Sequence, residues 1–137
     1  SKVKNSQNFA AFSEYMNFTT TLLVVCIILQ NKSVGIDFLL FFRSSIKCLK
    51  PGGSVVYSTC TLSPMQNDGV ISLALKFLWE ETSIDVSICD LSETIKPYKP
   101  FLNFSSNSKV TRFGQQITPS IGENFGPMYI AKIRRLT

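Results

Sequence analysis

A helical pattern, a glycine turn and a buried strand follow one another directly between Asp37 and Thr59. Apolar residues recur at helical spacing from Phe38 to Leu49, and polar residues lie between them. Pro51-Gly52-Gly53 then ends the helix, because proline and glycine interrupt helical backbone. The next six residues, SVVYST, are mostly β-branched or aromatic, which is typical of a central strand. This order predicts a fold in which helices and strands alternate.

The alternation continues through the rest of the chain. The apolar run Leu22–Leu29 could be a buried strand or a short buried helix, since periodicity cannot separate the two. The remaining predicted elements are a helix over 66–81 with Ser63 as its N-cap, a strand within Ser83–Leu91, an irregular surface excursion over 92–118, and a strand over Met128–Ile133. Strands that alternate with helices predict an α/β fold with a parallel or mixed sheet. Its ligand site is expected at the carboxyl ends of the strands.

Composition limits the chemistry of such a site. The 137 residues suffice for one domain with a hydrophobic core. The chain has no histidine and its four cysteines form no CxxC pair, so we expect no metal site and no Ser-His-Asp or Cys-His catalysis. The formal net charge of +5 suits a polyanionic partner such as RNA but does not require one. The longest continuous apolar run has eight residues, whereas a spanning helix needs roughly 18–20, so we predict no membrane segment.

Cys60 is the candidate catalytic residue, because it follows the carboxyl end of the predicted strand SVVYST. Its position alone leaves two interpretations open, a small residue of the core or a nucleophile. Cys26, Cys48 and Cys89 lie within apolar or helical stretches and are interpreted as core residues.

The longer string KPGGSVVYSTCTLSPMQNDGV around Cys60 resembles the Sun (NSUN) family of RNA cytosine-5 methyltransferases. The ending NFGPMYIAKIRRLT resembles the C-terminal strand of the mitochondrial members, above all the one that modifies ribosomal RNA. This resemblance covers roughly residues 38–137. It implies the C-terminal half of a Rossmann-like catalytic domain that uses S-adenosylmethionine, preceded by an unmatched segment over residues 1–37.

The resemblance also implies roles for residues. In this family a cysteine thiolate adds to C6 of cytosine so that C5 can attack the methyl group of S-adenosylmethionine, and Cys60 would be that nucleophile. Free cysteine, with a pKa of about 8.5, is only slightly ionised at neutral pH, and the positive end of the following helix could favour the thiolate. Lys132, Arg134 and Arg135 are candidate contacts to RNA phosphate, although a solvated tail explains them equally well.

Other parts of the family pattern are missing. The family binds its donor with a glycine-rich turn and carries an Asp-x-Pro-Cys segment, but residues 1–37 contain neither. We therefore identify no cofactor-binding residue and expect a truncated chain that is inactive alone. The alternative is a non-catalytic RNA- or protein-binding remnant of the fold. The resemblance further implies a mitochondrial location, although no presequence is visible, and a termination-factor-like protein partner.

Overall fold

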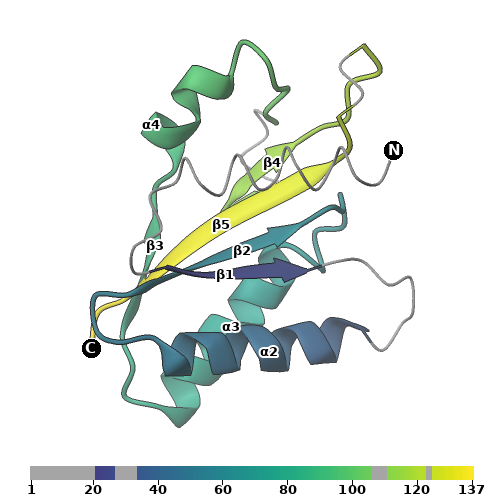
Figure 1. Cartoon of the computed structure of the whole chain (residues 1–137). Helices are drawn as coiled ribbons and strands as arrows, with labels where there is room; N and C mark the ends of the chain where they lie inside the picture. Colours follow the sequence, from purple (N-terminus) through teal and green to yellow (C-terminus); the bar gives the residue numbers. More distant parts are fainter. Residues whose placement is uncertain (1–20, 27–33, 106–110, 123–124) are drawn as a thin grey trace.

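The computed structural model describes residues 21–26, 34–105, 111–122 and 125–137 of the chain. Their strands form one mixed sheet in the order β1-β2-β5-β3, with the short strand β4 also paired to β5 (Figure 1). The elements are β1 (Thr21–Cys26), α2 (Val34–Cys48), β2 (Ser54–Thr59), α3 (Asp68–Glu81), β3 (Val86–Cys89), α4 (Ser92–Ile95), a 3-10 helix (Lys96–Tyr98), β4 (Gln115–Ile117) and β5 (Met128–Arg135).

Strand directions place three carboxyl ends at the same edge of the sheet. β1 runs parallel to β2, and β5 runs antiparallel to both β2 and β3. Thus β1, β2 and β3 all point the same way. β3 and β4 share one side of β5, because β3 pairs with residues 132–135 and β4 with residues 128–130. The edge at which β2 ends is therefore the one where an α/β fold places its ligand.

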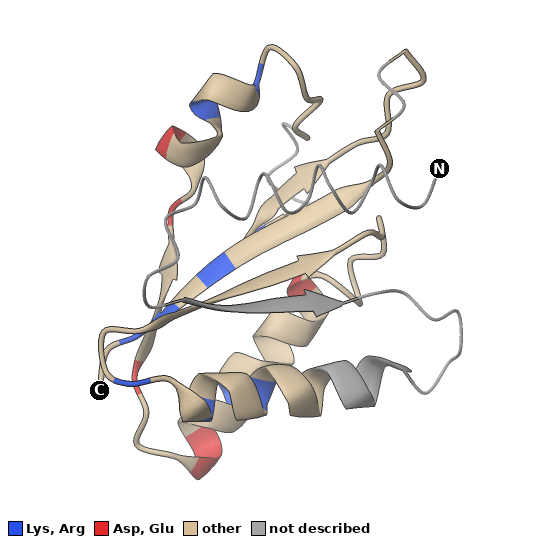
Figure 2. Ribbon diagram, in the orientation of Figure 1, with Lys and Arg blue, Asp and Glu red and all other residues tan. Residues whose placement is uncertain are grey.

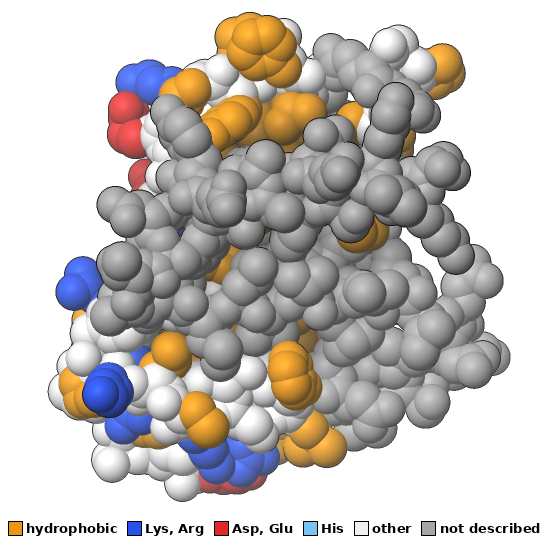
Figure 3. Space-filling view, in the orientation of Figure 1, with side chains coloured by type: hydrophobic (Ala, Val, Ile, Leu, Met, Phe, Trp, Pro, Cys, Tyr) orange, Lys and Arg blue, Asp and Glu red, His pale blue; other side chains and the backbone are white. Residues whose placement is uncertain are grey.

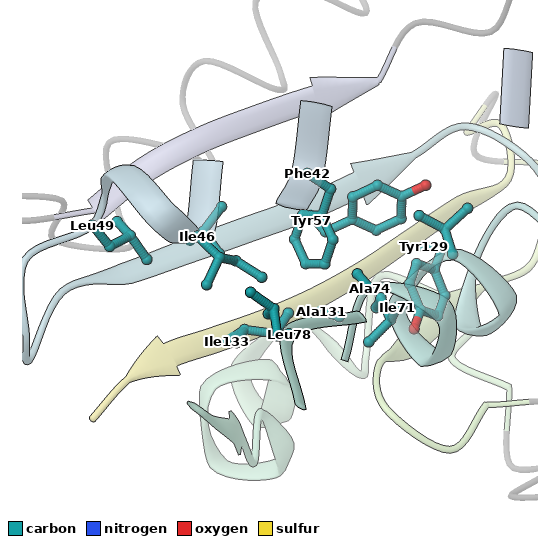
Figure 4. Packing of buried hydrophobic residues seen from close by; sticks show 12 residues of the cluster. Phe42, Ile46, Leu49, Tyr57, Ile71, Ala74, Leu78, Tyr129, Ala131 and Ile133 are labelled. Carbon is teal, nitrogen blue, oxygen red and sulfur yellow. The ribbon is translucent and has the colours of Figure 1, made fainter. Parts of the chain in front are cut away.

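One face of the sheet packs against α2 and α3 (Figure 1). Alternate residues of β2 and β5 point toward these helices, as the period of two in a strand requires. Phe42 of α2 lies on Tyr57 with ring centroids 5.0 Å apart, and Tyr57 meets the edge of Tyr129 at 6.3 Å (Figure 4). These fully buried rings sit in the half of the core toward the carboxyl end of β2.

The opposite face carries a smaller cluster beneath α4. It contains the intervening residues Val56 and Ile130 together with Leu91, Ile95 and Ile117. In the view of Figure 3, apolar side chains also lie on the surface over this part of the molecule. Within the part of the chain that is described, no helix is long and apolar enough to cross a bilayer.

Most predicted elements are confirmed. The helix before Pro51 is α2, the strand SVVYST is β2, and the part of Leu22–Leu29 that is described is a strand. The N-terminal segment over residues 1–37 is described only in part, and residues 1–20 and 27–33 lie outside the described residues. The final strand runs two residues beyond Ile133 because it also pairs with β3.

Three details of the prediction are wrong. Cys48 is exposed at the C-terminal end of α2 and Cys89 is only partly buried, so neither is the buried core residue that was expected. α3 begins at Asp68, and residues 64–67 form turns, so Ser63 is not its N-cap. The carbonyl of Ser63 instead accepts backbone hydrogen bonds from Gln66 and Asn67. The excursion over 92–118 is also less irregular than expected, since it contains α4, the 3-10 helix and β4. Strand β4 is only three residues long, too short for a recognisable alternation.

Candidate active site around Cys60

Cys60 is the first residue after β2, and its side chain is exposed and forms no disulfide. Thr59 before it is buried and pairs with Tyr129 of β5. On the other side of β2, the register places Cys26, the last residue of β1, opposite Thr59. The sheet thus brings two cysteine positions to neighbouring strand ends, and it presents Cys60 to solvent at the edge expected for a ligand.

Asn67 joins the two residues that flank Cys60. Its Oδ1 accepts a hydrogen bond from Thr59 Oγ1 at 2.5 Å. Its Nδ2 donates to the carbonyl oxygen of Thr61 at 3.0 Å. Asn67 is only 2% exposed, so these bonds form away from water, where polar groups need partners most. One buried amide therefore bonds to the residues on both sides of the candidate nucleophile, to the side chain of Thr59 and to the backbone of Thr61. We name Thr59, Cys60 and Thr61 the Cys60 turn.

Gln116 of β4 completes this network from a distant part of the sequence. Its Oε1 accepts the second Nδ2 hydrogen of Asn67 at 3.1 Å. Its Nε2 donates to the carbonyl oxygen of Met128 at 3.1 Å and lies 3.4 Å from that of Thr61. Gln116 is 3% exposed, and no buried side-chain nitrogen or oxygen among the described residues is left without a partner.

A second set of contacts fixes the start of α3 below the turn. Tyr57 donates its hydroxyl hydrogen to the carbonyl of Gln66 at 2.6 Å. Asp68 accepts hydrogen bonds from the Tyr129 hydroxyl and from the backbone N–H groups of Arg112 and Phe113. Burial raises the pKa of Tyr129 well above its usual range, and the hydrogen bond to Asp68 raises it further. Tyr129 therefore stays a neutral donor wherever the protein is folded at ordinary pH.

The basic residues of β5 lie away from Cys60. Arg134 pairs with Ser54 at the amino end of β2, about 17 Å of strand from Thr59. Arg135 donates to the carbonyl oxygens of Lys47 at 3.0 Å and Leu49 at 2.7 Å, at the C-terminal end of α2. Lys132 is nearer, opposite Val56. Figure 2 shows the blue segments of β5 toward its C-terminal end, so the structure does not bring the three basic candidates together with Cys60.

The glycine turn before β2 lies away from Cys60. The glycine turn with Gly52 and Gly53 precedes β2 and so lies at the edge opposite Cys60. Gly35 lies within α2. A surface hollow of about 390 Å³ opens between the end of β3 and the start of β4, lined mainly by residues 88–91 and 111–115, and Cys60 is not among its lining residues. The described part of the chain also contains no cluster of His, Cys, Asp or Glu that could hold a metal ion.

The chain resembles known proteins in sequence. It is 40% identical over 88 residues to the 5-cytosine rRNA methyltransferase NSUN4 of Bos taurus, an alignment that covers 64% of this chain. It is 33% identical over 106 residues, or 77% of the chain, to the mitochondrial tRNA (cytosine(34)-C(5))-methyltransferase of Mus musculus. The chain belongs to the Sun family of RNA cytosine-5 methyltransferases. No protein-family model matches it.

This Sun-family chain is short beside those relatives, since it spans 22% of the bovine protein and 28% of the mouse protein. In structure it is similar to NSun6 from Pyrococcus horikoshii, which was solved with SFG, an analogue of S-adenosylmethionine. The TM-score is 0.55 at 23% identity, and the match covers 77% of this chain and 23% of that one. The likeness confirms the predicted α/β fold as part of a Rossmann-like methyltransferase fold.

Sequence reasoning identified Cys60 but missed the residues that hold it. In the sequence, Asn67 and Asp68 suit either a helix start or a site role, and nothing local separates these two interpretations. Gln116 carried no signal, because it lies in a stretch predicted to be irregular. Only the pairing of β4 with β5 brings Gln116 beside the helix start.

Proposed function

We propose that this chain is part of an RNA cytosine-5 methyltransferase in which Cys60 is the nucleophile. The observation that supports this most is the exposed cysteine at the carboxyl end of β2, with Thr59 and Thr61 both bonded to the buried Asn67. A core cysteine needs no such support and is normally buried. An attacking thiolate needs both access to its substrate and a fixed position.

The chemistry of Cys60 follows from the reactivity of cytosine. Its thiolate Sγ forms a bond to C6, and the electron pair of the C5–C6 double bond moves toward C5. S-adenosylmethionine would supply the methyl group that C5 takes up, and S-adenosylhomocysteine would leave with the electron pair of the broken S–CH3 bond. Loss of the C5 proton to a base then restores the double bond, the C6–S bond breaks, and the thiolate leaves. Covalent catalysis of this kind divides one difficult substitution into easier steps.

The donor is proposed to bind outside this chain. Two observations support this: the turn with Gly52 and Gly53 lies at the edge opposite Cys60, and the chain spans only about a fifth of the NSUN4 sequence, 22% for the bovine protein. We therefore propose that residues 38–137 form the C-terminal half of the catalytic domain and that the 137-residue chain is inactive alone. The alternative is a non-catalytic remnant of the fold that binds RNA or protein.

We also propose a substrate, a location in the cell and a protein partner. The relatives named above are an rRNA and a tRNA methyltransferase, and one of them is named mitochondrial. We favour ribosomal RNA of the mitochondrion because the chain's C-terminal ending resembles that of the rRNA-modifying member. Of the three basic candidates on β5, Lys132 lies nearest in register to Cys60 and is the one we propose for RNA bound there. Arg134 and Arg135 lie toward the opposite edge of the sheet, so they could contact only RNA that extends to that edge. A termination-factor-like partner remains a prediction from the family.

The first experiment is a calorimetric titration of the 137-residue chain with S-adenosylmethionine. We expect no binding, because the donor site is proposed to lie outside this chain. Micromolar binding would contradict the proposal that the donor site lies outside the chain.

The second experiment tests the nucleophile in the longer protein that carries this segment. RNA methylation should vanish in Cys60→Ala and persist in Cys48→Ala, since Cys48 is an equally exposed cysteine on α2. Methylation that survives Cys60→Ala would overturn the assignment. A wild-type protein that binds RNA but never methylates it would favour the remnant.

A further inference from the structure

We propose that Gln116 is a positioning residue for Cys60, acting through Asn67 on the two residues that flank the cysteine. The proposal rests on the proposed role of Cys60 as nucleophile. Nothing in the sequence links Gln116 to Cys60, since 56 residues separate them. The link is a continuous line of buried hydrogen bonds from β5 through Gln116 and Asn67 to the Cys60 turn.

The first step concerns Asn67, whose amide is fully used. A primary amide has two N–H donors and one carbonyl acceptor group. The two donors go to the carbonyl of Thr61 and to Gln116 Oε1, and the acceptor receives the hydroxyl of Thr59. A rotated Asn67 would turn its oxygen toward the carbonyl of Thr61. The grip on both neighbours of Cys60 therefore requires one orientation of this amide.

The second step is that Gln116 requires the same orientation and so reinforces it. The carbonyl oxygen of Met128 can only accept, so the Gln116 group that faces it at 3.1 Å must be Nε2. Oε1 of Gln116 then faces Asn67 and can only accept, which requires Nδ2 of Asn67 on that side. Oδ1 of Asn67 consequently points to Thr59. A backbone carbonyl of β5 thereby determines the polarity of every bond up to the residue before Cys60.

The third step is that this order matters most at Cys60 itself. The Cys60 side chain is exposed, so burial does not immobilise it. Thr59, Asn67 and Gln116 are all 2–3% exposed and well packed. A rigid shell beneath an accessible nucleophile is the arrangement that keeps an attacking atom within reach of its target. Loss of Gln116 should therefore loosen Cys60 before it unfolds the domain.

A spin label on Cys60 measures this order directly. The label is attached in a background where the other three cysteines are serine, and its rotational correlation time is read by electron paramagnetic resonance well below the melting temperature. The variants are Gln116→Leu, which removes both hydrogen-bonding groups, and Gln116→Glu. Gln115→Leu is the matched control, since Gln115 is the adjacent residue of β4 and has no part in the network. A second label site, Cys48 on α2, reports general loosening.

Gln116→Leu should shorten the correlation time at Cys60 by about twofold or more, whereas Gln115→Leu and the label at Cys48 should show no change. Gln116→Glu adds a test within one molecule. A protonated carboxyl group can still donate to the carbonyl of Met128 and accept from Asn67, but a carboxylate cannot donate. Order at Cys60 should thus match wild type at about pH 5 and be lost at pH 8, since burial favours the protonated form of a carboxyl group.

Unchanged mobility at Cys60 in folded Gln116→Leu would overturn the proposal. So would equal loosening at Cys48, which would reduce Gln116 to a general stabilising residue. If Gln116→Leu does not fold, the pH dependence of Gln116→Glu decides alone, and a pH-independent label would reject the positioning role. The readout needs no methyl transfer. The two proposals can therefore fail separately. The label could show that Gln116 does not order Cys60 although Cys60 is the nucleophile. It could also show that Gln116 orders Cys60 although Cys60→Ala still methylates RNA, which would reject only the nucleophile.

Discussion

The two ends of strand β2 are held by different chemistry. At the amino end, backbone groups bond to each other: Gly52 N–H donates to the Arg135 carbonyl at 2.8 Å, and Arg135 N–H donates to the Gly53 carbonyl at 2.9 Å. At the carboxyl end, side chains form the bonds instead: Asn67 donates to the Thr61 carbonyl and to Oε1 of Gln116. The backbone pairing of the sheet therefore continues at the amino end of β2, whereas it stops at the carboxyl end, where the exposed Cys60 follows.

This difference separates a structural turn from a candidate site. Backbone hydrogen bonds need no particular side chain, apart from glycine where φ is positive, as at Gly52 with φ of 84°. Side-chain hydrogen bonds require particular residues at positions far apart in the sequence. A buried amide network also costs free energy if one member is lost, so its presence beside an accessible cysteine suggests a role beyond folding. Four predictions test this contrast.

The largest effect is expected from Gly114→Ala, just before β4. A Cβ there would lie 2.5 Å from the carbonyl oxygen of Ile130 and 2.5 Å from Cζ of Tyr129. Both are parts of the packed sheet and cannot move aside cheaply, so we expect a loss of about 3 kcal/mol or more in unfolding free energy. Urea denaturation measures it. Gly122→Ala is the control, because a Cβ at Gly122 meets nothing within 4 Å. Equal stability of the two variants would contradict this close packing.

The second prediction concerns Asn67→Leu. The change leaves the Thr61 carbonyl, the Thr59 hydroxyl and Gln116 without their shared partner. Unpaired buried groups cost about 1–3 kcal/mol each, and local rearrangement relieves part of this, so we expect a loss of about 2–3 kcal/mol. Gln66→Leu at the preceding position should cost much less, because only its backbone carbonyl bonds to Tyr57. A comparable loss of unfolding free energy in the two variants would contradict a particular structural role for the Asn67 amide.

The fold followed from the sequence where local signals were strong. α2, β2 and β5 show clear periodicity, and the Pro51-Gly52-Gly53 turn marks the boundary between two of them. β4 was missed because three residues cannot show a pattern, and its existence depends on pairing with β5. The start of α3 was misplaced because residues 64–67 form turns that a capping rule does not anticipate.

The site was predictable only in its central residue. Cys60 is marked by a long local motif, and a motif is a property of adjacent residues. The Asn67–Gln116 bond joins residues 49 positions apart, and no single sequence indicates such a pair. The three basic candidates were chosen as cations that could contact RNA phosphate, but strand direction carries Arg134 and Arg135 away from Cys60.

The third prediction tests the amino end through Arg135→Met. Its guanidinium donates hydrogen bonds to the carbonyl oxygens of Lys47 and Leu49 at the C-terminal end of α2. A cation is favourable there because the helix dipole is negative at that end. The site is partly exposed, so the expected loss is about 1 kcal/mol. Arg134→Met removes the same charge from an exposed position and should cost far less. Thermal unfolding compares the two variants. The spin label at Cys60 should respond to neither, and a response to Arg135→Met would mean that the two ends are coupled.

The smallest effect is a pH dependence assigned to Tyr129. Burial and the hydrogen bond to Asp68 raise the pKa of Tyr129, so the folded protein keeps this proton where an unfolded tyrosine would lose it. The resulting stability is complete below the unfolded pKa of about 10 and is lost progressively as pH rises above it. Tyr129→Phe has no proton to lose, so its stability should fall less steeply.

The relevant measurement is the difference in unfolding free energy between wild type and Tyr129→Phe at pH 8 and at pH 10.5. The difference should narrow by about 0.8 kcal/mol between these two pH values. All other titrating groups are common to both proteins, so they cancel in the comparison. A constant difference would mean that Tyr129 can ionise in the folded state. Asp68 would then bind to the backbone of Arg112 and Phe113 without constraining this hydroxyl, and the carboxyl end of β2 would depend on the Asn67–Gln116 network alone.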